Sequence, residues 1–236
     1  MLKRTFDFFC SFFGLILLSP LLLVAIIAIW LQDYKSPFYL APRIGKNFKP
    51  FTMVKLRSMV KNADKTGVSS TSADDVRITK VGHMIRKLKL DELSQLWNVL
   101  IGDMSLVGPR PNIKSDVETY SEYEKKLLSV RPGITDFSSI VFSDEGEILR
   151  GSEDPDADYV KLIRPWKSKL GVLYIENKNL LLDIKLIILT IQLALSRSEA
   201  LLSVSNIIKK LGAEEKLVEV CKREKSLTFF VEQRLS

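Results

Sequence analysis

The sequence predicts an α+β fold dominated by helices, with an apolar N-terminal membrane segment followed by one small mixed domain. Residues 5–31 contain a single charge, Asp7, and are long enough to cross a bilayer. The rest of the chain alternates short strand patterns, Gly and Pro turns and amphipathic helical stripes. A chain of 236 residues can bury one good core, with little left for a second full domain.

The composition narrows the class of partner and of chemistry. The chain has 35 Lys and Arg residues against 28 Asp and Glu, a net charge of +7, which favours membrane lipids or phosphorylated substrates. Nucleic acid is not expected, because no zinc-finger spacing, helix-turn-helix signature or RNA-binding aromatic motif is present. Two cysteines, Cys10 and Cys221, indicate reduced cytosolic thiols. One histidine, His83, argues against a His-based triad or a multi-histidine zinc site.

Residues 1–34 form the predicted membrane element. Basic residues flank the apolar run on both sides, at 3–4 and within 35–57, so both ends are expected on the cytoplasmic side. Pro20 removes a backbone donor in the middle of the run, and Ser19 can satisfy the freed carbonyl. We therefore expect a re-entrant helix hairpin, broken at Ser19-Pro20. A straight spanning anchor with a tolerated proline is the alternative.

Residues 35–200 form the predicted main domain, and residues 201–236 a C-terminal extension without an assigned role. The expected strands are a β-hairpin over 36–59, a short strand over 104–107 and an extended segment over 134–142. The expected helices cover 78–88, 91–101, 114–129, a segment after Pro155 and 179–196. Charged residues interrupt the apolar helix 179–196, which favours an amphipathic helix in the membrane interface over a spanning one.

An acidic pair, Asp91 and Glu92, stands at the head of an apolar helical stripe. The stripe consists of Leu93, Leu96, Trp97 and Leu100. The pair has a structural explanation, since Asp91 can cap the helix and Glu92 complements the helix dipole. Adjacent side chains on a helix diverge by ~100°, so the two carboxylates do not share one proton. They can instead divide two tasks, contact with an electrophile and binding of a divalent cation.

Arg110 lies between Pro109 and Pro111, which restrict its backbone and preset its planar group for bidentate contact with phosphate. Two other turn segments, "VKLRSM" and "VRPG", supply further basic residues: Lys55, Arg57 and Arg131. Each of these alone is equally well explained as a solvated surface charge. Together with the acidic pair and the membrane segment, they predict a phosphate-handling site at a bilayer surface.

Six segments, in order over residues 1–197, match one family. They are "KRTFDF", the apolar run with Ser19-Pro20, "RIGKNFKPFTMVKLRSM", "TKVGHMIRKLKLDELSQLWNVLIGDMSLVGPRP", "VRPGIT" and "NKNLLLDIKLIILT". On these segments the chain resembles the monotopic phosphoglycosyl transferases, the bacterial sugar transferase family that starts lipid-linked glycan assembly. Residues 201–236 lie outside the resemblance.

The resemblance implies an activity and a place for it. A sugar-1-phosphate passes from a UDP-sugar to polyprenyl (undecaprenyl) phosphate, with release of UMP, at the cytoplasmic face of the bacterial inner membrane. Asp91 is implied as the nucleophile that forms a covalent phosphosugar intermediate, and Glu92 as a ligand of Mg²⁺. The implied phosphate or substrate contacts are Arg110, Pro111, Arg131, Lys55 and Arg57.

The chain departs from the family after Gly133-Ile134-Thr135, where many members carry a Gly-Trp-containing segment. The sugar and the glycan pathway therefore stay open, as does a homo-oligomer. Two non-enzymatic interpretations compete with the enzyme: an inactive membrane-anchored scaffold for glycan-assembly enzymes, and a headgroup-binding amphipathic protein. The presence of Asp91, Glu92 and Arg110 favours the enzyme over both.

Overall fold

The computed structural model describes residues 1–68, 70–225 and 227. They form two compact units, the first from 1–66 and 76–134, the second from 67–75 and from 135 onward. Helices dominate both units, and the described strands pair into two small sheets, β1–β2 and β3–β4, which confirms the helix-dominated α+β class. Residues 226 and 228–236, in the predicted C-terminal extension, lie outside the described residues.

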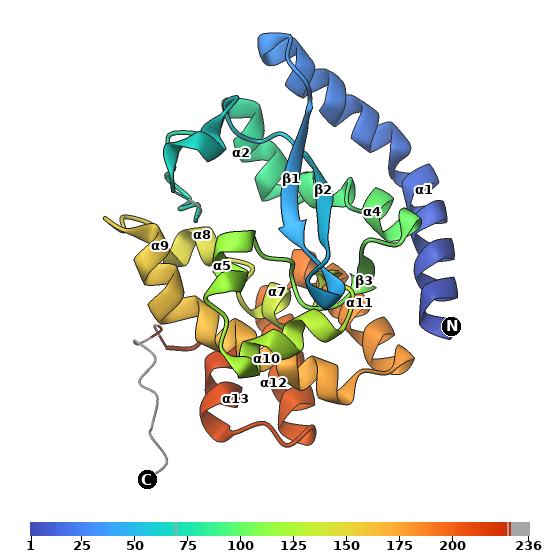
Figure 1. Ribbon diagram of the computed structural model, residues 1–236, viewed down its shortest axis with the longest axis vertical. Coiled ribbons are helices and arrows are strands. Elements are labelled where there is room, and N and C mark those ends of the chain that lie inside the picture. The colour runs from blue at the N-terminus through green and yellow to red at the C-terminus, as the bar shows by residue number, and fades with distance from the viewer. Residues whose placement is uncertain (69, 226, 228–236) are drawn as a thin grey trace. The chain divides into compact units, whose positions relative to one another are not determined.

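The first unit begins with the long helix α1 and a β-hairpin (Figure 1). Its elements are α1 (Leu2–Asp33), β1 (Phe38–Ile44), β2 (Pro50–Leu56), α2 (Lys80–Lys87), α3 (Leu90–Leu93), α4 (Leu96–Ile101), β3 (Ser105–Val107), α5 (Lys114–Glu118) and α6 (Glu122–Lys125). Three short 3₁₀ turns, Lys46–Phe48, Ala63–Thr66 and Lys126–Ser129, complete it, and β4 (Gly133–Thr135) leads into the second unit.

Helix α1 continues through Pro20, with no loop at Ser19-Pro20. The re-entrant hairpin itself stays a prediction. Figure 1 shows a single helix that changes direction partway along its length. Pro20 cannot donate to the carbonyl of Ile16, and the Ser19 hydroxyl donates to that oxygen instead, at 2.8 Å. This local compensation, which the sequence predicted, explains why the helix continues through the proline.

One face of α1 packs on the rest of the first unit. In its second half, Ala25 and Ile29 are buried with Leu56, Ile85 and Leu90 of β2, α2 and α3. The other face is exposed and apolar, with Phe9, Phe13, Leu17, Leu23, Val24 and Leu31 among its residues. Among the described helices, α1 is the one that is long and apolar enough to cross a membrane by length and composition.

The hairpin β1–β2 confirms the expected strand pair. Its antiparallel register places Tyr39, Ala41 and Arg43 on one face, together with Phe51, Met53 and Lys55. The middle of this face is core, because Ala41 and Met53 are buried against Val99 and Met104. The polar residues therefore lie at the two ends of a buried apolar patch.

Two expected helices are each split in the structure. The helix over 91–101 becomes α3 and α4, because the Ser94 hydroxyl binds the Asp91 carbonyl at 3.1 Å and competes for the oxygen that would continue the α-helical ladder. The helix over 114–129 becomes α5, α6 and a 3₁₀ turn. A capping box between Ser121 and Glu124 starts a new helix there.

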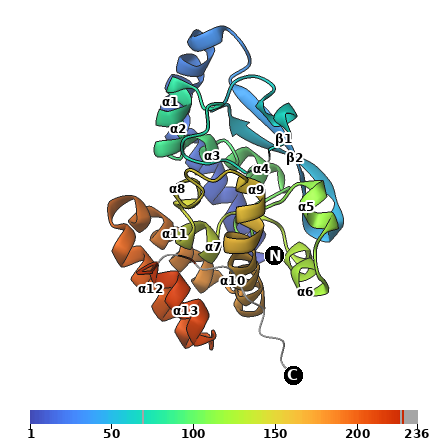
Figure 2. The same ribbon diagram turned by 90° about the vertical axis from the view of Figure 1, so that its left-hand side faces the viewer.

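The second unit is a helical cluster around fully buried Phe137, Trp166, Leu170, Leu186 and Ile208. Its helices are α7 (Phe137–Val141), α8 (Glu145–Ile148), α9 (Pro155–Asp158), α10 (Arg164–Asn177), α11 (Leu180–Leu195), α12 (Arg197–Lys210) and α13 (Glu215–Lys222), with a π-helical turn at Tyr159–Ile163. Figure 2 shows α12 and α13 lying side by side, in agreement with their extensive contacts.

The expected extended segment over 134–142 is correct only up to Thr135. The Asp136 carboxylate accepts a hydrogen bond from the Ser139 backbone N–H at 2.7 Å and caps α7, so a helix follows. The predicted limit of the main domain at residue 200 lies inside α12. The domain limits stay predictions.

Candidate active site

The acidic pair lies in the first turn of α3, immediately after a residue in a left-handed conformation. Lys89 has φ 55° and occupies the N-cap position, so the expected capping role of Asp91 is wrong. Leu90 is buried among the apolar residues of α1, α2 and β2 and anchors the turn. Asp91 follows as a helical residue, with 12% of its side chain exposed. The carboxylate is thus free from a backbone-capping task.

Side chains of α3 and α4 hold this turn against strand β2. The Ser94 hydroxyl shares its one proton between the carbonyls of Asp91 and Val54, each at 3.1 Å. The Asn98 amide oxygen accepts from the Val54 N–H at 2.8 Å. The Asn98 amide also donates to the Thr52 carbonyl at 2.7 Å. These bonds replace the neighbouring strand that β2 lacks on this side. They fix the acidic pair beside Lys55, the strand residue after Val54.

The expected apolar stripe is only partly correct. Leu96 is buried, but 51% of Trp97 is exposed. The split between α3 and α4 rotates the buried face, which now includes Ser94, Gln95 and Asn98. Ser94 and Asn98, which bond to the strand, therefore share the buried face with Leu93 and Leu96 of the predicted stripe.

Lys55 and Arg110 surround the two carboxylates. The Lys55 Nζ lies 3.6 Å from Asp91 Oδ2 and 3.9 Å from Glu92 Oε1. Arg110 forms a hydrogen-bonded ion pair with Glu92. The structure thus brings together four of the predicted site residues: Asp91, Glu92, Lys55 and Arg110.

The charges of this cluster act on one another. Burial alone would raise the pKa of Glu92, but the charges of Arg110 and Lys55 outweigh it and hold that pKa well below its usual range. Burial and the like charge of Arg110 lower the pKa of Lys55, against the opposing pull of Asp91 and Glu92. Glu92 is therefore an anion throughout the physiological range, in a setting dominated by cations.

Two glycines let the Arg110 and Arg131 loops approach closely. A Cβ atom on Gly108 would lie 2.6 Å from the Arg131 carbonyl oxygen, and one on Gly133 would lie 2.0 Å from the Gly108 nitrogen. The Gly133 N–H donates to the Pro109 carbonyl at 3.0 Å across this contact. Only glycine fits on both sides. The backbone around Arg110 is therefore fixed by the second loop as well as by its flanking prolines.

Two predicted site residues have other partners. The Arg57 guanidinium bonds both carboxylate oxygens of Asp33 at 2.7 and 2.6 Å and the Ser36 carbonyl at 2.7 Å, and its side chain is 8% exposed. The Arg131 Nε donates to the Gly102 carbonyl at 2.8 Å, at the C-terminal end of α4. The structure does not bring either residue to the acidic pair.

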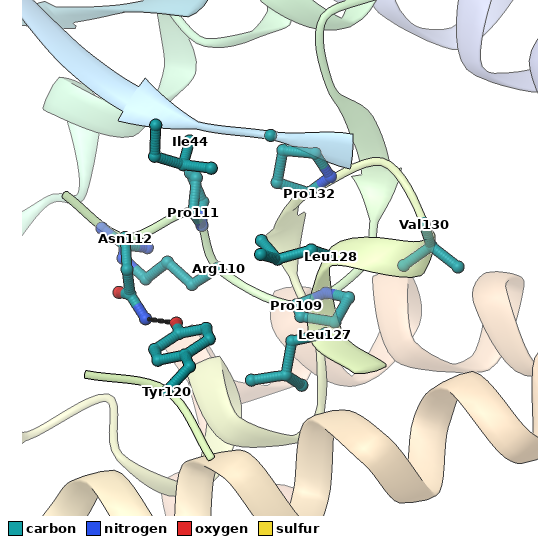
Figure 3. A pocket seen from close by; sticks show the side chains of 11 residues that line it. Ile44, Pro109, Arg110, Pro111, Asn112, Tyr120, Leu127, Leu128, Val130 and Pro132 are labelled. Carbon is teal, nitrogen blue, oxygen red and sulfur yellow. Dashed lines mark hydrogen bonds between the residues drawn. The ribbon is translucent and has the colours of Figure 1, made fainter. Parts of the chain in front are cut away.

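A pocket adjoins the cluster on the side of Arg110 (Figure 3). Pro109 and Pro111 line it next to Arg110, and Tyr120 forms another wall, with its hydroxyl bonded to the Asn112 amide. Ile44, Gly45, Leu127, Leu128, Val130 and Pro132 complete the lining. Pro111 is thus a wall residue of a largely apolar recess rather than a polar contact.

No sequence pattern selects Arg43 or Lys89 as a site residue. Lys89 contributes positive charge to the surroundings of Glu92. Burial lowers the pKa of Arg43; the like charge of Arg110 adds to this, while Tyr39 and Asp116 oppose it. The signal for Arg43 was its alternation with Ala41 and Tyr39, which predicts a common strand face but not what that face meets.

The carboxylates of the site suit a metal ion that is held in part by substrate oxygens. The described residues contain no group of three or more Asp, Glu, His or Cys side chains arranged to hold a metal ion. Mg²⁺ commonly uses one or two carboxylates and completes its shell with water and substrate phosphate oxygens. The ionised, partly exposed Glu92 beside Asp91 is compatible with that mode.

Comparison with known proteins supports the family resemblance found in the sequence. The family model described as bacterial sugar transferase matches residues 1–197. The chain is 36% identical over 192 residues to the uncharacterized sugar transferase EpsL of Bacillus subtilis, covering 81% of this chain and 86% of that protein.

Two longer relatives have names that state an activity. The UDP-N-acetylgalactosamine-undecaprenyl-phosphate N-acetylgalactosaminephosphotransferase of Aeromonas hydrophila is 34% identical over 199 residues, covering 83% of this chain and 44% of that protein. The undecaprenyl-phosphate galactose phosphotransferase of Salmonella typhimurium is 35% identical over 217 residues, covering 84% of this chain and 41% of that protein. The match with this chain thus spans less than half the length of each.

Proposed function

The chain belongs to the bacterial sugar transferase family, and on that premise we propose that it transfers a sugar-1-phosphate from a UDP-sugar to polyprenyl phosphate and releases UMP. The observation that carries the proposal is the cluster of Asp91, Glu92, Lys55 and Arg110. Two adjacent carboxylates held among cations fit a reaction in which an anionic diphosphate must approach an anionic nucleophile.

In the first half-reaction, a carboxylate oxygen of Asp91 attacks the phosphorus atom nearest the sugar. A new P–O bond to Asp91 forms as the P–O bond to the UMP phosphate breaks, and UMP leaves with that electron pair. Lys55, 3.6 Å from Asp91, neutralises charge on the attacked phosphoryl group. Arg110 neutralises charge on the departing side, where it already binds an anion, Glu92.

In the second half-reaction, a phosphate oxygen of the polyprenyl phosphate attacks the same phosphorus. The bond to Asp91 breaks, the carboxylate is regenerated, and polyprenyl-diphospho-sugar is released. A covalent intermediate suits two substrates from different phases, because each one visits the site in turn. Glu92 would hold Mg²⁺ together with substrate oxygens, and the ion would offset the charge of the diphosphate.

The attachment of α1 supports a monotopic arrangement on the membrane. At its start, Lys3 donates to the Val107 carbonyl at 3.1 Å, and buried Asp7 accepts from the Ser105 hydroxyl at 2.8 Å. At its end, Asp33 is paired with Arg57. Both ends are thus bound to the same compact unit, which a helix crossing the bilayer could not achieve without carrying that unit through it. The proposal therefore places α1 as a re-entrant helix at the cytoplasmic face of the inner membrane.

The identity of the released nucleotide tests the proposed reaction. Purified full-length chain in nanodiscs would receive Mg²⁺, undecaprenyl phosphate and one UDP-sugar at a time. We expect UMP with one or a few donors, which would also identify the sugar, since the relatives' names differ in it. Release of UDP would identify an ordinary glycosyltransferase. No release from folded protein with any donor would favour an inactive scaffold.

A further inference from the structure

The contacts among Asp91, Lys55, Glu92 and Arg110 run in one direction, from the proposed nucleophile to Arg110. Lys55 contacts Asp91 at one end and Glu92 next to it. Glu92 in turn contacts Arg110, and Arg110 lines the pocket with Ile44 and Asn112. This row of contacts therefore leads from the proposed nucleophile to the recess shown in Figure 3. A donor that reacts at Asp91 and extends along the cations brings its UMP phosphate to Arg110.

Arg43 lies beside this row, and its charge acts on both Arg110 and Lys55. It lies on the same hairpin face as Lys55, and the next residue, Ile44, lines the pocket. The Ile44 N–H donates to the Asn112 carbonyl at 3.0 Å, which ties this end of β1 to the segment that carries Arg110. Two guanidinium groups are thus brought to one side of the site from two separate segments.

Glu92 pairs with Arg110 but not with Arg43. In the part of the chain that the structure describes, Arg43 donates a hydrogen bond to the carbonyl of its neighbour Pro42 at 2.8 Å, and no carboxylate lies within ion-pair distance of it. Its surroundings are unfavourable for a second cation, since burial and the charge of Arg110 both lower its pKa. Like charges held together at a partly buried site are stabilised by an anion placed between them.

We propose that Arg43 and Arg110 together bind the phosphate that leaves with the nucleotide, so that the donor lies with its sugar end at Asp91 and its UMP phosphate at the two arginines. This inference rests on the proposed function and assigns its leaving-group side. Lys55 serves the transferred phosphoryl group, and the arginine pair serves UMP. Arg43 is thus a substrate-binding residue that the acidic motif does not reveal.

Binding of UMP to the full-length chain tests the proposal without turnover. Arg43→Gln should weaken UMP binding, measured by calorimetry in nanodiscs with Mg²⁺, at least about tenfold, since a charge-assisted bond to phosphate is lost. Binding of uridine, which lacks the phosphate, should not change. Arg43→Lys keeps the charge and should recover part of the affinity. The matched control is Lys46→Gln, which removes one exposed positive charge from the hairpin turn and should leave UMP affinity unchanged.

The outcomes separate this inference from the proposed function. Unchanged UMP affinity in folded Arg43→Gln, while the wild-type chain still releases UMP, would overturn the role of Arg43 and leave the reaction intact. Equal weakening by Lys46→Gln would also overturn it, because the effect would then come from long-range charge. Release of UDP by the wild-type chain would instead refute the proposed function itself.

Discussion

The Glu92 carboxylate lies between two cations, with Arg110 bonded to it and Lys55 at 3.9 Å. Glu92→Gln should lower the free energy of unfolding at pH 7 by about 1–3 kcal/mol, because two cations then lose their common anion. Chemical denaturation of the variant and of the control Glu118→Gln would measure this. Glu118 pairs with Lys114 on the exposed surface, so its loss should change stability little.

The pH dependence of that difference has a definite sign. The folded pKa of Glu92 lies below its unfolded value, so its stabilising contribution is present above the unfolded pKa and is lost as pH falls toward the folded pKa. The gap between wild type and Glu92→Gln should be constant from about pH 8 to 5 and shrink below about pH 4.3, the ordinary pKa of Glu. A gap that grew on acidification would contradict the charge cluster.

At the scale of single residues, the sequence predicted most of the site. The acidic pair, Arg110 and Lys55 were selected from local motifs, and the structure brings them together. Arg57 and Arg131 were selected by the same reasoning, yet they bind Asp33 and Gly102. A basic residue in a turn shows that charge is available, but its partner depends on tertiary contacts that no local pattern contains. Arg43 was missed for the same reason.

At the scale of elements, the Arg57–Asp33 pair joins the end of α1 to the segment after β2. Since the Arg57 side chain is 8% exposed, breaking the pair leaves a nearly buried charge unpaired. Arg57→Ala and Asp33→Asn should each lower the free energy of unfolding, and the double variant should cost little more than either one.

Donor kinetics of the same variants separate this structural role from phosphate binding. If Arg57 held substrate phosphate, Arg57→Ala would raise the KM for the donor and Asp33→Asn would not. Similar stability losses with an unchanged donor KM in both variants would support a purely structural role for the Arg57–Asp33 pair. A KM effect confined to Arg57→Ala would return Arg57 to the substrate site.

The elements also show where local patterns are insufficient. The hairpin, α2, β3 and α11 follow from periodicity and turn residues, and the structure confirms them. The division of 91–101 into α3 and α4 depends on Ser94, whose hydroxyl meets a strand 40 residues away in the sequence. The helix α7 depends on one capping carboxylate, Asp136, inside a segment rich in strand-forming residues.

At the scale of the whole molecule, the family match ends at residue 197, but the packed structure does not. Helix α12 contacts α7 and α11, and Val204 and Ile208 are fully buried. A chain cut after residue 200 should therefore lose the cooperative unfolding transition of the second unit. A chain cut after residue 225 keeps α12 and α13 and should retain it. Thermal unfolding of both shortened chains would test this. An unaltered transition in the shorter chain would show that α12 and α13 are not needed for the stability of the second unit.

The attachment of both ends of α1 to one unit predicts the topology of the whole molecule. Single cysteines near Met1 and near Lys35, in a background without Cys10 and Cys221, should both be shielded from a membrane-impermeant thiol reagent added outside intact cells. Both should react after the cells are opened. Labelling of one end alone from outside would mean that α1 spans the membrane.

The covalent step at Asp91 is the central claim, and intact-mass analysis of the protein tests it most directly. Wild-type chain incubated with its UDP-sugar and Mg²⁺, without polyprenyl phosphate, should gain the mass of one sugar phosphate on the peptide that contains Asp91. One equivalent of UMP should be released, and added polyprenyl phosphate should discharge the adduct. Asp91→Asn should form no adduct and remain folded, whereas Glu118→Gln should behave as wild type. Release of UMP only in the presence of the acceptor, with no adduct at any time, would contradict the claim.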